Sequence, residues 1–268
     1  MIELDKRSKD LRRSVVRMVE VDRRGHIGPA LSLIEILRVL YDSFLKFDPK
    51  NPKLTNRDRF ILSKGHGCLA LYSILADKGF FPKEEFDNFC KSTSFLGGHP
   101  ERNKASGVEA STGALGHGMP MGVGMALAAR IRKQDYRVVV VMGDGEINEG
   151  SVWEAALSAS KHKLSNLTIF IDHNKLQSYG LTSEVLDMSP LVDKWRSFGF
   201  EVEEVDGHDV NALEKLVKRL PFNNNKPTAV ICHTIKGKGF YFAEGQAGWH
   251  HKSGLNPEDI SAMYKCLE

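Results

Sequence analysis

Residues Val138–Gly150 read VVVVMGDGEINEG, and residues Ile169–Gln177 read IFIDHNKLQ. Each stretch begins as an apolar run typical of a buried strand and then reaches a polar residue, Asp144 in the first and Asn174 in the second. Asn174 follows Asp144 by 30 residues, about the length of one strand–helix–strand unit. Parallel sheets bind ligands at the edge formed by the carboxyl ends of their strands, so the sequence predicts that the two side chains lie side by side at this edge.

This pair of side chains has the chemistry of a magnesium diphosphate site. Mg²⁺ prefers oxygen ligands and is usually held by one or two protein groups together with phosphates and water. Asp144 supplies a charged oxygen, and Asn174 supplies a neutral amide oxygen that does not repel a diphosphate. Gly143 and Gly145 let the backbone approach phosphate, and a helix that starts near Glu149 would point its N–H groups toward the anion. A simple strand-ending turn is the alternative for GDG alone, and the second polar strand end argues against it.

The GDG…N pattern at this spacing resembles the thiamine-diphosphate-binding motif, and the longer form GDGEINEGSVWEAA…IDHNKLQ resembles the transketolase family. The resemblance implies that thiamine diphosphate is the cofactor. It also implies that Asp144, Asn174 and the backbone carbonyl of Leu176 hold the metal, which we expect to be Mg²⁺, although Ca²⁺ or Mn²⁺ could replace it. Gly143 and Gly145 would then lie against the diphosphate.

Other segments resemble the same family in the same order along the chain, over about residues 10–255. They are GHIGPALSLIEIL with His26, LSKGHGCLALYSIL with His66, GGHPE with His99, STGALGHGMPMGVGMA from Ser111 to Ala126, HTIKGKG from His233 to Gly239, and WHHK from Trp249 to Lys252. So many matching motifs in one order are not explained by coincidence.

The resemblance gives roles to several histidines. His26 and His99, each beside glycine in an expected loop, match histidines that line the substrate channel, where they can hydrogen-bond substrate hydroxyls and move protons. His66 matches a channel histidine close to the cofactor and counts with them as a catalytic candidate. His250 matches a histidine near the diphosphate, but the neighbouring His251 could fill that role.

Three glycines in the six residues 113–118 allow the backbone to approach an anion or a planar ring closely, and a tight loop with positive φ is the alternative. The resemblance favours cofactor contacts through Gly113, Leu115 and Gly116. It also implies that Ile235 packs against the cofactor and that Glu149 lies at a subunit interface, where acidic residues join two cofactor sites.

The remaining polar residues near these motifs receive no catalytic role. Asp172 would brace the metal loop, and the role of His117 stays open because many transketolases carry glutamine there. A histidine taken alone is more often structural or exposed than functional, which is the expectation for His162, His173, His208 and His233.

The composition is that of one large α/β domain over residues 1–268, with 41% hydrophobic residues and a net charge of +3. This small, dispersed charge argues against a nucleic-acid-binding protein. The four cysteines have no CxxC spacing, which is typical of reduced, cytoplasmic proteins. We find neither a signal peptide nor a run of membrane-spanning length, so we expect a cytoplasmic protein without a membrane partner.

The elements alternate between strand and helix in the second half, which predicts a parallel sheet with helices on both faces. The expected strands are Tyr136–Met142, Leu167–Asp172, Phe200–Val205 and Thr228–Thr234, with helices at Ser151–His162, Pro190–Phe198 and Val210–Leu220. The first half is expected to hold helices at Leu11–Val21, Pro29–Leu45, Gly67–Lys78 and Pro82–Phe89, a glycine-rich helix ending near Gln134, and at Phe60–Leu62 either a short strand or the start of a helix.

The resemblance also implies what the chain lacks. Transketolases need a glutamate that hydrogen-bonds the aminopyrimidine ring of the cofactor, and this glutamate belongs to a second, pyrimidine-binding domain. Complete family enzymes are much longer than this chain, which leaves no room for that domain. We therefore expect the amino-terminal subunit of a split transketolase, completed by a carboxy-terminal subunit in an α₂β₂ assembly. The implied reaction moves a two-carbon glycolaldehyde unit from a ketose phosphate to an aldose.

Other functions are compatible with part of the pattern. The α subunit of a 2-oxoacid dehydrogenase or a deoxyxylulose-phosphate-synthase-like enzyme would carry a similar GDG…N site, but GGHPE and LSKGH fit transketolase better. A non-catalytic regulatory protein could retain the fold, but it would be expected to have lost the metal ligands or the channel histidines. A nicotinamide-dependent enzyme is disfavoured because no GxGxxG follows a first strand.

Overall fold

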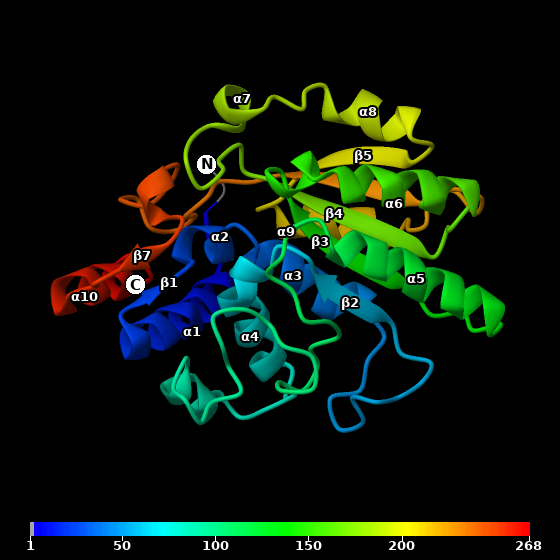
Figure 1. Cartoon of the computed structure of the whole chain (residues 1–268). Coiled ribbons are helices and arrows are strands. Elements are labelled where there is room, and N and C mark those ends of the chain that lie inside the picture. The colour runs from blue at the N-terminus through cyan, green and yellow to red at the C-terminus, as the bar shows by residue number, and fades with distance from the viewer. Residues whose placement is uncertain (1–2) are drawn as a thin grey trace.

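A five-stranded, all-parallel sheet forms the centre of the computed structural model, which describes residues 3–268 (Figure 1). The strand order is β2–β3–β4–β6–β5. The strands are β2 (Arg59–Leu62), β3 (Val138–Gly143), β4 (Leu167–His173), β5 (Glu201–Asp206) and β6 (Thr228–His233). The predicted fold class is confirmed, and the four strands predicted in the second half differ from the observed ones by one or two residues at their ends.

Two hydrophobic cores cover the two faces of this sheet. Successive strand side chains point to opposite faces, so Val139 and Val141 join one core while Val138 and Val140 join the other. The first core includes side chains from α1 (Lys6–Asp22), α2 (Ile27–Leu31), α3 (Ile34–Val39), α4 (Cys68–Asp77), α9 (Val210–Val217) and α10 (Pro257–Lys265). The second includes side chains from α5 (Gly118–Ile131), α6 (Gly150–Lys161) and α8 (Leu191–Ser197), and the short α7 (Thr182–Val185) lies outside both.

The single helix predicted over Pro29–Leu45 is wrong, because the chain forms α2, α3 and a π-helical turn at Leu40–Phe44 instead. The break between α2 and α3 coincides with Ser32, whose hydroxyl donates to the Pro29 carbonyl and to the Asp172 carboxylate under the helix. The apolar pattern is thus interrupted at a residue that makes a polar tertiary contact. The helix predicted at Pro82–Phe89 is a 3₁₀ segment, Lys83–Asn88, and Phe60–Leu62 belongs to a strand.

A second, two-stranded sheet has no counterpart among the predicted elements. Its antiparallel strands β1 (Arg24–Gly25) and β7 (Lys252–Ser253) have only two residues each, too few for a periodic signal. In Figure 1 the blue amino-terminal and red carboxy-terminal segments lie together beside this ladder, with α10 against α1. The ladder matters for the site because His26 follows β1 and His251 precedes β7.

The remaining elements are short 3₁₀ segments at Gly65–Gly67, Glu146–Asn148 and Ala247–Trp249. The four cysteines are free. Within residues 3–268, we find no helix with the length and apolar character needed to cross a membrane.

Candidate active site

The metal-binding candidates lie side by side at the carboxyl edge of the sheet, as the strand pattern predicts. Strands β3 and β4 are neighbours, Gly143 is paired with Asp172, and the Asp144 N–H donates to the Asp172 carbonyl at 3.3 Å. The Asp144 carboxylate accepts hydrogen bonds from the backbone N–H groups of Gly145 at 2.8 Å and Lys175 at 2.5 Å. The two strand-end loops are thus tied to each other by this carboxylate.

A cavity of about 230 Å³ opens at this edge. It brings together most of the residues predicted from the sequence, namely His26, His66, His99, Gly113, Leu115, Gly143, Asp144, Gly145, Asn174, Leu176 and His250. It is also lined by six residues with no predicted role: Pro29, Lys64, Glu146, Gln177, Ser178 and Lys236.

Three predicted cofactor residues are not among the residues that line the cavity. Gly116 lies behind the wall, where its N–H donates to Glu146 at 3.0 Å and its carbonyl accepts from Ser151 at 2.9 Å. Its φ of +79° explains the glycine, since a Cβ there would lie 2.6 Å from the Glu149 Cβ. Glu149 packs against Gly116, and Ile235 is held through its backbone N–H by His208.

The donor set fits a hard cation. Asp144 offers a carboxylate, Asn174 an amide oxygen and Leu176 a backbone carbonyl, the mixture of oxygens that Mg²⁺ takes together with phosphates and water. The Leu176 carbonyl already accepts from the Lys236 ammonium at 2.9 Å, so the structure places a positive charge at this position. Among residues 3–268 there is no cluster of three or more His, Cys, Asp or Glu side chains able to hold a metal. The candidate donor set combines one carboxylate with an amide oxygen and a backbone carbonyl.

Asp172 fixes the orientation of the Asn174 amide. It is fully buried and accepts from the Ser32 hydroxyl at 2.6 Å, from the Asn174 amide at 3.1 Å, and from Lys64 and Thr234. Burial alone would raise the pKa of Asp172, but the Lys64 ammonium and the surrounding donors hold it below its usual value. Because the Asn174 NH₂ group donates to this carboxylate, its carbonyl oxygen accepts from the Leu176 N–H and keeps a second lone pair that could bind a metal.

Two buried lysines make the cavity suitable for an anion, and neither has a role predicted from the sequence. Lys64 is paired with Asp172, and the Lys236 ammonium contacts His250 Nδ1 at 2.8 Å as well as the carbonyls of Leu176 and Gln177. Burial and the nearby Lys64 charge lower the pKa of Lys236 to about 8, as expected for a cation without a carboxylate partner of its own. Both lysines stand within motifs quoted above, Lys64 in LSKGH and Lys236 in HTIKGKG, and these motifs are the sequence feature that could have pointed to them.

Five histidine rings gather at one end of the cavity. The His26 ring lies 5.5 Å from those of His66 and His250, 5.6 Å from His99 and 4.6 Å from His251, measured between centroids. Burial is the main cause that lowers the pKa of His26 to about 4 and of His250 to about 3, and it also lowers the pKa values of His66 and His99. Near pH 7 these four rings are therefore neutral, and each can donate one hydrogen bond and accept another.

The structure separates the two histidines of WHHK. His250 lines the cavity of the metal candidates and contacts Lys236. His251 points instead into an adjoining cavity of about 330 Å³ that includes His26 and His99 but none of the metal candidates. The geometry therefore associates His250 with the anion end of the site.

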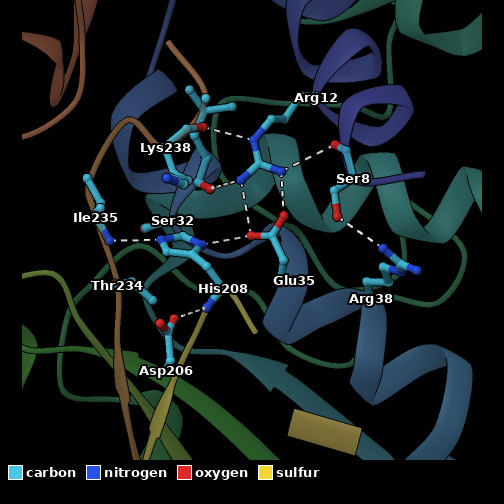
Figure 2. Close-up of polar contacts among 12 residues, drawn as sticks. Ser8, Arg12, Ser32, Glu35, Arg38, Asp206, His208, Thr234, Ile235 and Lys238 are labelled. Carbon is cyan, nitrogen blue, oxygen red and sulfur yellow. Dashed lines mark hydrogen bonds and ion pairs between the residues drawn. The ribbon is translucent and has the colours of Figure 1, made fainter. Parts of the chain in front are cut away.

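The other histidines lie away from the cavity lining. His173 and His233 pack at 5.4 Å on the sheet edge, His117 Nδ1 lies 3.0 Å from the Leu115 carbonyl, and His162 is exposed. His208 is buried and contacts both Glu35 and the backbone of Ile235 (Figure 2).

Residues 5–267 match the family described as transketolase, thiamine diphosphate binding domain. An apulose-4-phosphate transketolase subunit from Phocaeicola vulgatus is 43% identical over 248 residues, which cover 92% of this chain and 88% of that protein. The 6-deoxy-6-sulfo-D-fructose transketolase subunit SqwG from a Clostridium species is 41% identical over 227 residues, 85% of this chain and 82% of that protein. A crystal structure of a transketolase variant from Pichia stipitis superposes with a TM-score of 0.90 at 33% identity over 98% of this chain, which spans 40% of that longer protein. The chain therefore belongs to the transketolase family and forms its thiamine diphosphate binding domain.

Proposed function

We propose that the chain is the amino-terminal subunit of a split transketolase and forms the diphosphate half of a thiamine diphosphate site. The observation that carries this proposal is the joint position of Asp144 and Asn174 at adjacent strand ends, above a cavity that also holds two buried lysines and the histidine cluster. The names of the two relatives, each called a transketolase subunit, support a separate partner chain for those proteins. They also favour transketolase over a 2-oxoacid dehydrogenase or a regulatory protein.

Each part of the cavity has a distinct task in this proposal. Asp144, Asn174 and the Leu176 carbonyl would hold Mg²⁺, while Lys64 and Lys236 would offset the diphosphate charge. When bound, thiamine diphosphate supplies a nucleophilic carbon that attacks a carbonyl and an electron sink for the resulting electron pair. The chain itself binds and orients the substrate. His26 is neutral near pH 7, so it can accept a proton from a substrate hydroxyl, and His99 can hydrogen-bond a second hydroxyl.

The activating glutamate is assigned to the partner, together with the pyrimidine-binding domain and groups that bind the sugar phosphate. The single domain of this chain contributes the metal and diphosphate contacts. We propose an α₂β₂ assembly in which Glu149 lies where the two cofactor sites meet. The transferred unit would be the two-carbon glycolaldehyde group of a ketose phosphate, and the acceptor an aldose.

Reconstitution tests this function. The purified chain and the product of the neighbouring gene are assayed separately and together, with Mg²⁺, thiamine diphosphate and a panel of pentose phosphates, branched sugar phosphates and sulfonated sugars. We expect turnover only from the mixture, and light scattering of the active complex should give the mass of two copies of each chain. Full transketolase activity from the chain alone would refute the split-enzyme proposal, and the panel identifies the substrate class.

The His250–His251 doublet offers a prediction about roles within the site. Because His250 lines the metal-candidate cavity and contacts Lys236, His250→Ala should weaken thiamine diphosphate binding by the reconstituted pair by about tenfold, the order expected for losing one buried hydrogen bond to a charged group. His251→Ala should leave the cofactor Kd nearly unchanged and raise KM for the sugar. Isothermal titration and steady-state kinetics measure both effects, and the reverse pattern would contradict the assignment.

A further inference from the structure

His208 connects the cofactor side of the cavity to the interior of the protein. It follows β5 and is 5% exposed. Its Nε2 accepts the backbone N–H of Ile235 at 2.9 Å, and its Nδ1 lies 2.8 Å from Glu35 Oε2 (Figure 2). Both ring nitrogens are therefore engaged, one by a loop that leads into the cavity and the other by a carboxylate on α3.

These two contacts determine which nitrogen carries the proton. A backbone N–H can only donate, so Nε2 must be the unprotonated acceptor of the Ile235 bond. A neutral imidazole has one N–H, which then belongs to Nδ1 and donates to the Glu35 carboxylate. His208 is accordingly held in the Nδ1–H form by its two partners.

Glu35 is a fixed partner because it is itself locked in place. Its side chain and that of Arg12 are 1% and 0% exposed, and the guanidinium binds both carboxylate oxygens, at 2.5 and 3.1 Å. Burial would raise the pKa of Glu35, but Arg12 and His208 lower it to about 2, so it is ionised near neutral pH. Figure 2 shows this chain of contacts running from Arg12 on α1 through Glu35 to His208.

The same network reaches the loop at residues 234–239 at a second point. Arg12 Nε donates to the Lys238 carbonyl at 2.8 Å, three residues beyond the Ile235 N–H that His208 accepts. Lys236 lies between these two anchors, and its ammonium extends to the Leu176 carbonyl and to His250. The position of the backbone at residues 234–239 therefore determines whether the Lys236 ammonium reaches the end of the cavity that holds the Leu176 carbonyl and His250.

We propose that His208 is a positioning residue that, through its Nδ1–H form, holds the loop at residues 234–239 so that Lys236 projects into the diphosphate cavity. An apolar residue of similar size would leave the Ile235 N–H without its acceptor, a costly arrangement in the interior, and would remove one of the two donors to Glu35 Oε2, which would keep only its bond from Arg12. The inference rests on the proposed function only for the identity of the anion that Lys236 meets.

Two substitutions separate the two hydrogen bonds of His208. The amide of His208→Asn takes the place of Nδ1, so it can still donate to Glu35 but offers nothing to Ile235. The amide oxygen of His208→Gln takes the place of Nε2 and can still accept the Ile235 N–H. We expect His208→Asn to raise the Kd of the reconstituted pair for thiamine diphosphate with Mg²⁺ about tenfold, and His208→Gln to change it less than about threefold. The matched control is His162→Asn at an exposed site.

Magnesium pyrophosphate is the second probe, because its binding to the chain does not require transketolase turnover. As for thiamine diphosphate, His208→Asn should weaken the binding of magnesium pyrophosphate more than His208→Gln does. Thermal unfolding of each variant reports any general loss of structure. A Kd of His208→Asn equal to that of the wild type, or an equal loss in His208→Gln, would overturn the proposal.

The wild-type chain provides a direct test of the protonation of His208. ¹⁵N spectra of selectively labelled histidine, with the His208 signal assigned by its loss in His208→Gln, should show His208 with its proton on Nδ1, and the Ile235 amide should exchange slowly with solvent. An Nε2-protonated His208 or a rapidly exchanging Ile235 amide would refute the positioning role. If these tests succeed while the reconstituted pair shows no turnover, the positioning role stands and the proposed function fails.

Discussion

Replacement of Asp144 by alanine is expected to abolish Mg²⁺-dependent binding of thiamine diphosphate by the reconstituted pair. The change removes the one carboxylate of the proposed donor set, its local hydrogen bond from the Gly145 N–H, and the hydrogen bond from the Lys175 N–H that ties the two strand-end loops together. Loss of outer-shell partners of metal ligands already costs about 10–100-fold in affinity, so loss of the charged ligand itself should cost more than about 100-fold. Isothermal titration with and without Mg²⁺ measures the effect.

Two further variants make this result specific. Asp144→Asn keeps the size of the side chain and part of its hydrogen bonding but removes the charge, so it should bind the cofactor weakly and need much more Mg²⁺. Asp135→Ala removes an exposed carboxylate and should bind like the wild type. Unchanged cofactor affinity in Asp144→Ala would refute the metal assignment.

The second large effect is expected in the stability of the fold. Arg12→Met leaves the buried Glu35 carboxylate without its guanidinium partner, and breaking a buried pair in this way costs about 3–5 kcal/mol in the free energy of unfolding. Urea unfolding of the isolated chain measures the loss. Arg17→Met is a matched control on the same helix, since the Arg17–Asp87 pair is exposed by 38% and 55% and should contribute about 0–1 kcal/mol. A loss as small as that of the control would contradict the argument.

The dependence of stability on pH in the acid range is a second measurement of the Arg12–Glu35 pair. The pKa of Glu35 is lowered from 4.5 to about 2 in the folded chain, so the stability that its ionised form contributes is present above about pH 4.5 and is lost as the pH falls toward 2. In Arg12→Met the carboxylate loses the positive charge that holds its pKa down. This variant should therefore show a weaker fall in stability over the same pH range.

The local pattern predicted the parts of the site that depend on strand geometry. Apolar runs that end in Asp144 and Asn174 are sufficient to place both residues at one sheet edge, because neighbouring parallel strands end together. The glycine at position 116 likewise corresponds to a positive φ. These features follow from rules that act over a few residues or over one strand–helix–strand unit.

The parts that could not be predicted depend on contacts between distant segments. The break between α2 and α3 coincides with the hydrogen bond from Ser32 to Asp172, which is 140 residues away along the chain. Lys64 and Lys236 stand in the motifs LSKGH and HTIKGKG, but the motifs do not reveal that both lysines are buried or that they contact Asp172 and Leu176. The sequence predicts only a structural or exposed His208, since nothing near it in the chain reveals that Glu35 and Ile235 occupy its two nitrogens.

The β1–β7 ladder has a consequence for the histidine cluster. Two-residue strands are too short to hold together unaided, so the closeness of His26 and His251 depends on the packing of α1 against α10 and on bonds such as that from the Leu255 N–H to the Arg23 carbonyl at 3.1 Å. The packing of α1 against α10 thus helps to fix the distance between the two histidine rings. Substitutions between α1 and α10 are therefore expected to change the distance between the His26 and His251 rings.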